Sequence, residues 1–457
     1  MDPRDLTVSQ AAASIRDGEL SPVTLVESLL ERIDALEPSL KAWVTLDREA
    51  ALSAARESEE VLKQRGPKGL LHGVPVGVKD IFYTQGVLTT ACAPRYADFV
   101  PDHNATSVAR LKDAGAIILG KTVTTQFAAG DPSPTFSAWH PEHTPGGSSS
   151  GSAVAVSTRM CPAALGSQTG GSTLRPAAYN GIVGLKATYG RISKYGVVPL
   201  AWSLDTVGVL VRTVEDAALM LQVMSGYDSD DPTSSPHPVD DYVGAMQGPL
   251  TPPHIGVVRD FFYEGATEEV RRHTDEAVNR LKSSGADVRE VQLPRTFMAH
   301  DAACRVVYNV EAAAFHQQMY IDNPDGYGPS LRRTIESGVL HSGVDYLQAQ
   351  RVRAMFRDEM REVMEGVDIL LTPATPSAAP RDRTTTGDPV FQRAWTSVGI
   401  PTISIPSGLD EGGMPLGIQL ASVPFAETRL LAAARWCEQA LDVTLVPPGL
   451  PGHSPNP

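Results

Sequence analysis

Residues 144–187 read TPGGSSSGSAVAVSTRMCPAALGSQTGGSTLRPAAYNGIVGLKA, and they carry the strongest structural signal in the chain. The first glycine-rich run, at 146–151, leads directly into the apolar segment 153–156. A second run, Gly-Gly-Ser, ends at 172 and precedes a further apolar segment at 180–185. Flexible linkers continue in Gly and Ser without apolar residues, so the first run does not fit a linker. Both runs are predicted to be backbone-permissive loops held against a buried core.

Short apolar strands alternate with helices and glycine-rich turns on both sides of this stretch. The strands are expected at 74–78, 116–119, 163–165, 182–185, 207–211, 255–258, 287–291, 369–371 and 402–405. Such alternation predicts an α/β layer fold. We expect a single large domain whose central mixed, twisted sheet is covered by helices on both faces.

The first 60 residues are predicted to be helical. Thr7 with Gln10 three positions later fits a capping box. Ser21 followed by Pro22 marks the start of a second helix. The Glu-Pro pair at 37–38 is expected to end that helix.

The composition excludes several function classes. With 457 residues, 42% hydrophobic and 20% charged, the chain is typical of a soluble globular protein. Its formal net charge of −14 argues against the clustered basic surface of a nucleic-acid-binding protein. The sequence has no long apolar run and no secretory signal, so no membrane span and a cytoplasmic location are expected. The four cysteines are widely spaced and no His-Glu-x-x-His occurs, so neither a metal nor another cofactor is expected.

Three polar residues are candidates for catalysis: Lys79, Ser148 and Ser172. Lys79 has apolar neighbours on both sides, which favour burial and therefore the neutral amine. A neutral lysine can act as a base, and two serines on loops can act as relay and nucleophile. This combination indicates acyl transfer without histidine. The simpler interpretations are a solvated lysine, a serine in a turn, and a serine that caps a helix at 173–178.

Two other motifs compete with this interpretation. Residues 115–122, GAIILGKT, match the P-loop pattern, but the residues between the glycines are apolar and favour a strand. Residues 147–151, GSSSG, match the nucleophile elbow, which would make Ser149 the nucleophile and require a histidine partner. The available histidines, none in a distinctive setting, are His254, His273, His300, His316 and His341. Nucleotide binding and the elbow are therefore the less favoured interpretations.

Taken together, the motifs resemble those of the amidase signature family, including its broad-specificity amidases, aryl acylamidases and urethanases. The motifs that stand in the family's order are LHGVPVGVKD at 71–80, the two glycine-rich runs, GLK at 184–186, SLDT at 203–206, GIPTISIP at 399–406 and PLGIQ at 415–419. The resemblance implies one domain over 1–457. Its expected parts are an N-terminal helical segment at 1–65, a catalytic core at 70–225, a variable substrate-shaping region at 226–395, a C-terminal core segment at 396–446 and an irregular tail at 447–457.

The resemblance also implies a Ser-cisSer-Lys triad in which Ser172 attacks the carbonyl carbon, Ser148 relays the proton and Lys79 is the base. The oxyanion hole is expected from the backbone N–H groups of Thr169, Gly170, Gly171 and Ser172. The candidate substrate contacts are Gln168, Ser149 and Trp395. In two places the sequence departs from the family's usual motif: Gln168 stands where Asp is frequent, and Leu174 where Arg is frequent, with the arginine displaced to Arg175.

A mostly apolar cleft is expected, and it would suit aryl or alkyl amides, esters or carbamates. One alternative is the glutaminase-type subunit of a tRNA-dependent amidotransferase, which needs a partner chain; Gln168, Leu174 and the acidic charge weigh against it. A second alternative is a non-enzymatic binding protein with a decayed site, which the intact triad argues against. The expected partner is a small molecule, with neither nucleic acid nor membrane. A homodimer is compatible with the resemblance.

Overall fold

The computed structural model describes residues 2–450; residues 451–457 of the expected tail lie outside this range. The strands are β1 (Trp43–Leu46), β2 (Pro75–Lys79), β3 (Ile117–Thr122), β4 (Ala163–Gln168), β5 (Val183–Lys186), β6 (Thr206–Val211), β7 (His254–Val257), β8 (Asp287–Glu290), β9 (Ile369–Pro373), β10 (Thr402–Leu409) and β11 (Pro415–Ala421). The α-helices are α1 (Val8–Arg16), α2 (Pro22–Leu40), α3 (Arg48–Arg65), α4 (Thr106–Asp113), α5 (Ser150–Ser157), α6 (Leu174–Asn180), α7 (Val214–Met224), α8 (Phe262–Gly265), α9 (Glu268–Ser283), α10 (Phe297–Asp322), α11 (Pro329–Leu340), α12 (Gly343–Val363), α13 (Val390–Val398) and α14 (Glu427–Leu441).

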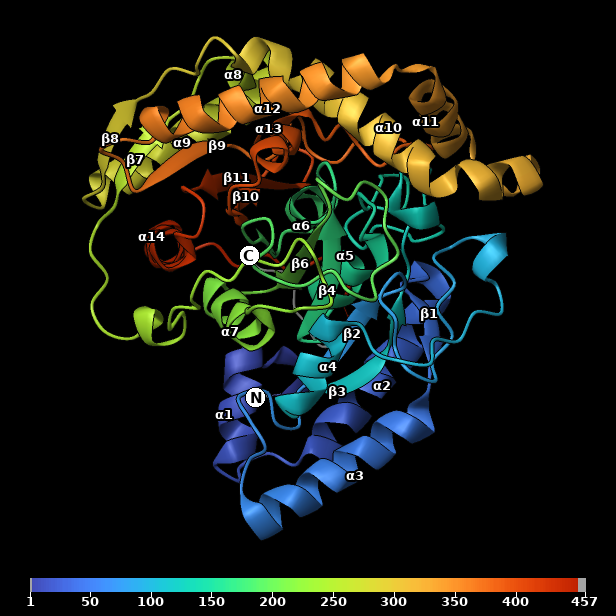
Figure 1. Ribbon diagram of the computed structural model, residues 1–457. Coiled ribbons are helices and arrows are strands. Elements are labelled where there is room, and N and C mark those ends of the chain that lie inside the picture. Colours follow the sequence, from blue (N-terminus) through green and yellow to red (C-terminus); the bar gives the residue numbers. More distant parts are fainter. Residues whose placement is uncertain (1, 451–457) are drawn as a thin grey trace.

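Within residues 2–450 the strands form one eleven-stranded sheet in the order β1-β3-β2-β4-β6-β5-β10-β11-β9-β7-β8 (Figure 1). β2 runs parallel to β3 and β4, and β7 runs parallel to β8 and β9. The strands between these two groups pair antiparallel. The sheet is therefore mixed, as the sequence predicts, and β2 and β4 are buried along their whole length.

Helices flank this sheet on both faces, which also confirms the prediction from the sequence. α5 and α6 contact each other and the central strands, while α7 and α14 form a second contacting pair against the sheet. The long helices α10 and α12 lie together with α11 along one side of the molecule, far from α2 and α3 (Figure 1). Among the helices of the described chain, none has the length and apolar character needed to cross a membrane.

The N-terminal helices begin where their capping residues predict. Thr7 and Gln10 form the capping box of α1, and the Ser21 hydroxyl accepts N–H groups of the first turn of α2. The expectation that the Glu-Pro pair ends the second helix is wrong, because α2 continues to Leu40 with Pro38 inside it. The Glu37 carboxylate accepts the N–H groups of the two residues after Lys41, which stabilises this later end.

The segment that matches a P-loop is strand β3, as its apolar residues predict. Lys121 of this segment is buried inside the sheet rather than exposed in a phosphate-binding loop. Its Nζ donates to the Phe82 carbonyl and the Thr89 hydroxyl, both at 2.6 Å, and lies 3.5 Å from the Asp80 carboxylate. Because Lys121 Nζ is bound by these groups inside the protein, its role is structural.

Candidate active site

Lys79 is the last residue of β2, and its side chain is fully buried. Its Nζ lies 2.7 Å from the Ser148 Oγ and 2.7 Å from the Ser167 Oγ. Burial lowers the pKa of Lys79 well below its ordinary value, and the Asp205 carboxylate opposes this shift. Because desolvation disfavours the ammonium form, Lys79 can act as a neutral base.

Ser148 lies in the loop before α5, and the Gly147–Ser148 peptide bond is cis. Two backbone hydrogen bonds hold this loop. The Thr125 N–H donates to the Ser148 carbonyl at 3.2 Å, and the Ser149 N–H donates to the Ser172 carbonyl at 3.2 Å. The second bond joins the two glycine-rich runs, so Ser148 and Ser172 lie on adjacent loops.

Ser172 lies between β4 and α6 and is 8% exposed, at the wall of a pocket. Within residues 2–450 the N–H groups of Gly170, Gly171 and Ser172 donate no hydrogen bond. The Thr396 hydroxyl donates a hydrogen bond of 2.8 Å to the Gly170 carbonyl. Unused N–H groups beside a nucleophile are the arrangement that stabilises an oxyanion.

The pocket beside Ser172 has a volume of about 400 Å³. Its walls come from the second glycine-rich run, from α10 and α11, and from the chain around the start of α13. The lining residues are Ala128, Ala129, Gly130, Thr169, Gly170, Gly171, Ser172, Arg175, Leu200, Cys304, Arg305, Tyr308, Asn309, Ser330, Thr334, Thr385, Thr386, Gly387, Pro389 and Arg393. Among these described residues three are arginines and none is acidic. The pocket is therefore basic rather than mostly apolar.

Arg175 is the most buried of the three arginines, at 4% exposed. Its Nη2 donates to the Gly147 carbonyl at 2.7 Å, whereas its Nε and Nη1 have no partner within the described residues. Burial lowers the pKa of Arg175 to about 10, which leaves it charged at neutral pH. Arg393 and Arg305 share one carboxylate, that of Asp301. The lining itself thus holds three cations and no acidic residue, while Asp301 binds two of the arginines and the charge of Asp388 acts on Arg175.

Gln168, a candidate substrate contact, lies outside this lining. It is fully buried, and its Oε1 accepts the N–H groups of Thr173 and Leu174, both at 3.0 Å. Its Nε2 donates to the Thr396 hydroxyl at 3.0 Å. Gln168 therefore holds the start of α6, and the departure from the family's usual Asp is accommodated within the core.

Ser149 and Trp395, the other two candidate contacts, also lie outside the lining. The Ser149 hydroxyl donates to the Ser167 carbonyl at 3.4 Å and accepts the Ser167 N–H at 3.3 Å. Trp395 is fully buried and stacks on Phe262, with ring centroids 5.4 Å apart. The elbow interpretation also loses support, because backbone groups already occupy the Ser149 hydroxyl.

Two residues that the sequence interpretation missed complete the site. Ser167 is the second hydroxyl bound to Lys79. Asp205 is fully engaged: one carboxylate oxygen accepts the Thr169 hydroxyl at 2.6 Å, and the other accepts the N–H groups of Leu200 and Ala201. The SLDT motif at 203–206 contains Asp205 without indicating its role, and no local pattern marks Ser167.

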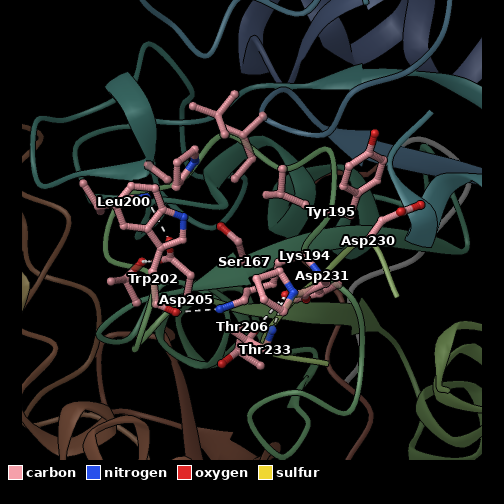
Figure 2. A pocket seen from close by; sticks show the side chains of 18 residues that line it. Ser167, Lys194, Tyr195, Leu200, Trp202, Asp205, Thr206, Asp230, Asp231 and Thr233 are labelled. Carbon is pink, nitrogen blue, oxygen red and sulfur yellow. Dashed lines mark hydrogen bonds between the residues drawn. The ribbon is translucent and has the colours of Figure 1, made fainter. Parts of the chain in front are cut away.

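A second cavity, of about 190 Å³, adjoins the pocket, and the two share Ala128, Thr169 and Leu200. Figure 2 shows Ser167, Trp202 and Asp205 among the side chains around it. One part of its further lining is apolar, with Ile81, Val197, Val198, Pro199 and Val207, and another part is charged, with Lys194, Asp230 and Asp231. The mostly apolar cleft expected from the sequence is therefore not found beside Ser172, where the pocket is basic, and apolar side chains gather in this neighbouring cavity instead.

The family model for amidases matches residues 24–431. The chain therefore belongs to the amidase family, and it is an enzyme of the amidase signature type. The fold, the resemblance of its motifs and the Lys79–Ser148 contact all agree with this assignment.

The individual relatives include both amidotransferase subunits and a peptide amidase. A glutamyl-tRNA(Gln) amidotransferase subunit of Geotalea daltonii is 38% identical, covering 97% of this chain and 98% of its own. The corresponding subunit of Thermotoga maritima has a solved structure with 31% identity and a TM-score of 0.80, covering 96% and 95% of the two chains. The peptide amidase of Stenotrophomonas maltophilia has 28% identity and a TM-score of 0.86, covering 97% and 98%. A chain from a vestigial complex related to an s-triazine catabolic enzyme has 29% identity and a TM-score of 0.90, covering 96% and 99%.

Proposed function

We propose that this chain hydrolyses the C–N bond of a small amide through an acyl-enzyme on Ser172. The observation that carries the proposal is the buried contact between Lys79 and Ser148, on the loop next to Ser172. Neutral Lys79 takes the Ser148 hydroxyl proton while Ser148 takes that of Ser172, whose oxygen bonds to the carbonyl carbon. The relay then runs backwards, and the nitrogen leaves with the proton as the C–N bond breaks. Water releases the acid product by the same route.

The oxyanion of the tetrahedral intermediate would lie against the free N–H groups of Gly170, Gly171 and Ser172. Losing one such donor costs ~3–4 kcal/mol of transition-state stabilisation. The loop that carries these donors is held on two sides, by Thr396 at Gly170 and by Asp205 at Thr169. Donors that are fixed before the substrate arrives need no reorganisation during the reaction.

The basic pocket supports a substrate whose acyl part carries a carboxylate. Burying a cation is costly unless it is paired, and within the described residues Arg175 bonds to no carboxylate and has two N–H groups without a partner. A carboxylate in the pocket would supply that counter-charge and can accept two parallel N–H bonds from a guanidinium. Arg393, 16% exposed at its side chain, adds a second cation at the same pocket.

Glutamine is an amide of this class, and the glutaminase-type function is therefore our first candidate. The curated relatives named as glutamyl-tRNA(Gln) amidotransferase subunits, at 34–38% identity over almost the whole chain, support it. The two departures that weighed against it in the sequence, Gln168 and Leu174, are both buried outside the pocket and make no contact there. In this function a partner chain would receive the ammonia.

Hydrolysis of aryl or alkyl amides, carbamates or esters is the second candidate. The apolar cavity next to the pocket favours it, because a ring or alkyl chain on the substrate could lie against Trp202 and Val207. The similarity to a peptide amidase, an enzyme named for a substrate other than glutamine, agrees with this candidate.

A matched set of amides separates the two candidates. The set holds glutamine, glutaramate, uncharged pentanamide and the nitroanilide of glutarate, each followed by ammonia or nitroaniline release. The first candidate predicts that kcat/KM for glutamine and glutaramate exceeds that for pentanamide at least tenfold, a difference of about 1.4 kcal/mol. Preference for the anilide favours the second candidate. Faster turnover of pentanamide than of glutaramate contradicts the carboxylate-bearing substrate class.

A further inference from the structure

Lys79 Nζ contacts two serine hydroxyls, and the mechanism above uses only one of them. Ser148 and Ser167 both place Oγ at 2.7 Å from the nitrogen. Ser167 lies on β4, which pairs parallel with β2 and so brings Ser167 beside the end of Lys79's strand. Ser148 reaches the same nitrogen from the loop before α5.

The hydrogen-bonding capacity of a neutral lysine makes these contacts unequal. A neutral amine has one lone pair and two N–H bonds, whereas an ammonium has three N–H bonds and no lone pair. To take a proton from Ser148, the lone pair must point at the Ser148 hydroxyl. One of the two N–H bonds then points at Ser167, whose oxygen can accept it.

Few other groups could hold Lys79 Nζ in that orientation. Lys79 is fully buried, and within residues 2–450 these two hydroxyls are the partners of its Nζ. Asp205 acts on Lys79 through its charge, while its carboxylate oxygens are bound to Thr169 and to backbone N–H groups. Without Ser167, rotation about the last side-chain bond could turn the lone pair away from Ser148.

We propose that Ser167 is a positioning residue of the reaction: its Oγ accepts an N–H of neutral Lys79 and so directs the lone pair of Lys79 at Ser148. This inference rests on the proposed function of the Lys79–Ser148–Ser172 relay. Ser167 also lines the neighbouring cavity and is 7% exposed, so its side chain lies between that cavity and Lys79 Nζ (Figure 2).

Four variants test the proposal: Ser167→Ala, Ser167→Cys, Ser167→Thr and the control Ser157→Ala. Ser157 is a buried serine whose hydroxyl bonds within its own helix, to the Val154 carbonyl at 3.1 Å. We would measure kcat and KM on the best amide, the pH dependence of kcat/KM, and the rate at which phenylmethanesulfonyl fluoride labels Ser172. Thermal melting checks the fold, and Ser167→Cys keeps the side-chain size if Ser167→Ala does not fold.

The expected result is a loss of roughly 10²-fold in kcat and in the labelling rate for Ser167→Ala and Ser167→Cys, with KM unchanged. The acid limb of kcat/KM should also move to lower pH, because an acceptor at N–H favours the ammonium form and its loss favours the amine. Ser167→Thr keeps the hydroxyl and should restore the rate to near wild type. Rates within about twofold of Ser157→Ala for both Ser167→Ala and Ser167→Cys would overturn the proposal.

The proposed function has its own, separate readout. Ser172→Ala and Lys79→Ala are made in parallel with the Ser167 variants. If those two retain turnover, the relay itself is wrong and the role of Ser167 falls with it. If they are inactive while Ser167→Ala and Ser167→Cys remain fully active, only the role of Ser167 is wrong.

Discussion

Asp205 and Thr169 are joined by a 2.6 Å hydrogen bond, and through it a buried carboxylate reaches the loop that carries the expected oxyanion hole. The other oxygen of Asp205 accepts the N–H groups of Leu200 and Ala201. One side chain thus fixes the shared wall between the basic pocket and the apolar cavity. It also places a negative charge near Lys79.

Asp205→Asn is expected to lower kcat. An amide side chain has one acceptor oxygen, so either Thr169 or the two backbone N–H groups lose their partner, at a cost of ~1–3 kcal/mol. Removing the charge also lets the pKa of Lys79 fall further, which moves the acid limb of the kcat/KM profile to lower pH. Asp113→Asn, an exposed change on α4, is the control. An unchanged kcat and an unchanged pH profile of kcat/KM would show that Asp205 neither positions the Thr169 loop for the reaction nor affects the pKa of Lys79.

The pH dependence of the wild-type enzyme follows from Lys79. Its pKa is lowered by burial, so kcat/KM should rise as pH increases through that lowered value and then level off. Lys79→Arg places a permanently charged group in the same position and should be inactive at every pH. Lys63→Arg, on the exposed face of α3, should behave as wild type. A folded Lys79→Arg enzyme with measurable turnover would contradict the role of Lys79 as base.

The two glycines of the expected oxyanion hole should differ sharply. A Cβ at Gly171 would lie 2.7 Å from Gln392 Oε1 and 3.1 Å from Pro389 Cβ, whereas a Cβ at Gly170 would lie 3.7 Å from its nearest neighbour. Gln392 is fully buried and bonded to the Ala374 carbonyl, so it cannot move aside freely. Gly171→Ala should therefore lower kcat about 10²- to 10³-fold, the loss expected when a donor moves.

Gly170→Ala is the matched control for that change and should retain most of the activity. Steady-state kinetics on one amide, with circular dichroism to confirm the fold, is sufficient for both variants. Equal activity of the two variants would mean that the position of these N–H groups does not limit the reaction.

The arginines of the pocket should raise kcat/KM for amides that carry a carboxylate relative to uncharged amides. Arg393→Met removes a largely buried cation from the pocket wall and leaves Asp301 with Arg305 alone. A hydrogen bond to a charged group contributes ~1.5–3 kcal/mol, so kcat/KM for glutaramate should fall by about ten- to hundredfold. Turnover of pentanamide should stay within about threefold of wild type, since that substrate has no carboxylate to lose.

The control for this change is Arg333→Met, an exposed arginine of α11 that lies outside the lining. It should affect neither substrate. Parallel losses on both amides in Arg393→Met would point to a general distortion and would remove the argument for a carboxylate-bearing substrate.

The sheet could be predicted well from the sequence, because short apolar runs between glycine-rich turns mark buried strands. Two strands were not expected. β1 is a run of only four residues, Trp43–Leu46, on an edge of the sheet within a stretch predicted to be helical, and β11 follows β10 after a short turn. The end of α2 was misplaced because Pro38 normally disfavours a helical residue before it, while the bonds from Glu37 that offset this are not visible in a local pattern.

Part of the site could also be predicted from local sequence patterns. Lys79, Ser148 and Ser172 each stand in a distinctive local setting, and the structure brings the first two into contact. The basic character of the pocket was not predictable, because Arg175, Arg305 and Arg393 are far apart in the sequence and meet only in the fold. Gln168 is predicted as a substrate contact from its place in the motif, but its Oε1 accepts the first N–H groups of α6, a contact that no local pattern indicates.

The most direct test of the nucleophile is the intact mass of the protein after incubation with phenylmethanesulfonyl fluoride, followed by peptide mapping. Attack by the activated serine on the sulfonyl group should leave one adduct, on Ser172, and abolish amide turnover. The Ser172→Ala protein, folded by circular dichroism, should remain unlabelled. An adduct on Ser149 with loss of activity, or full amide turnover by Ser172→Ala, would contradict the account.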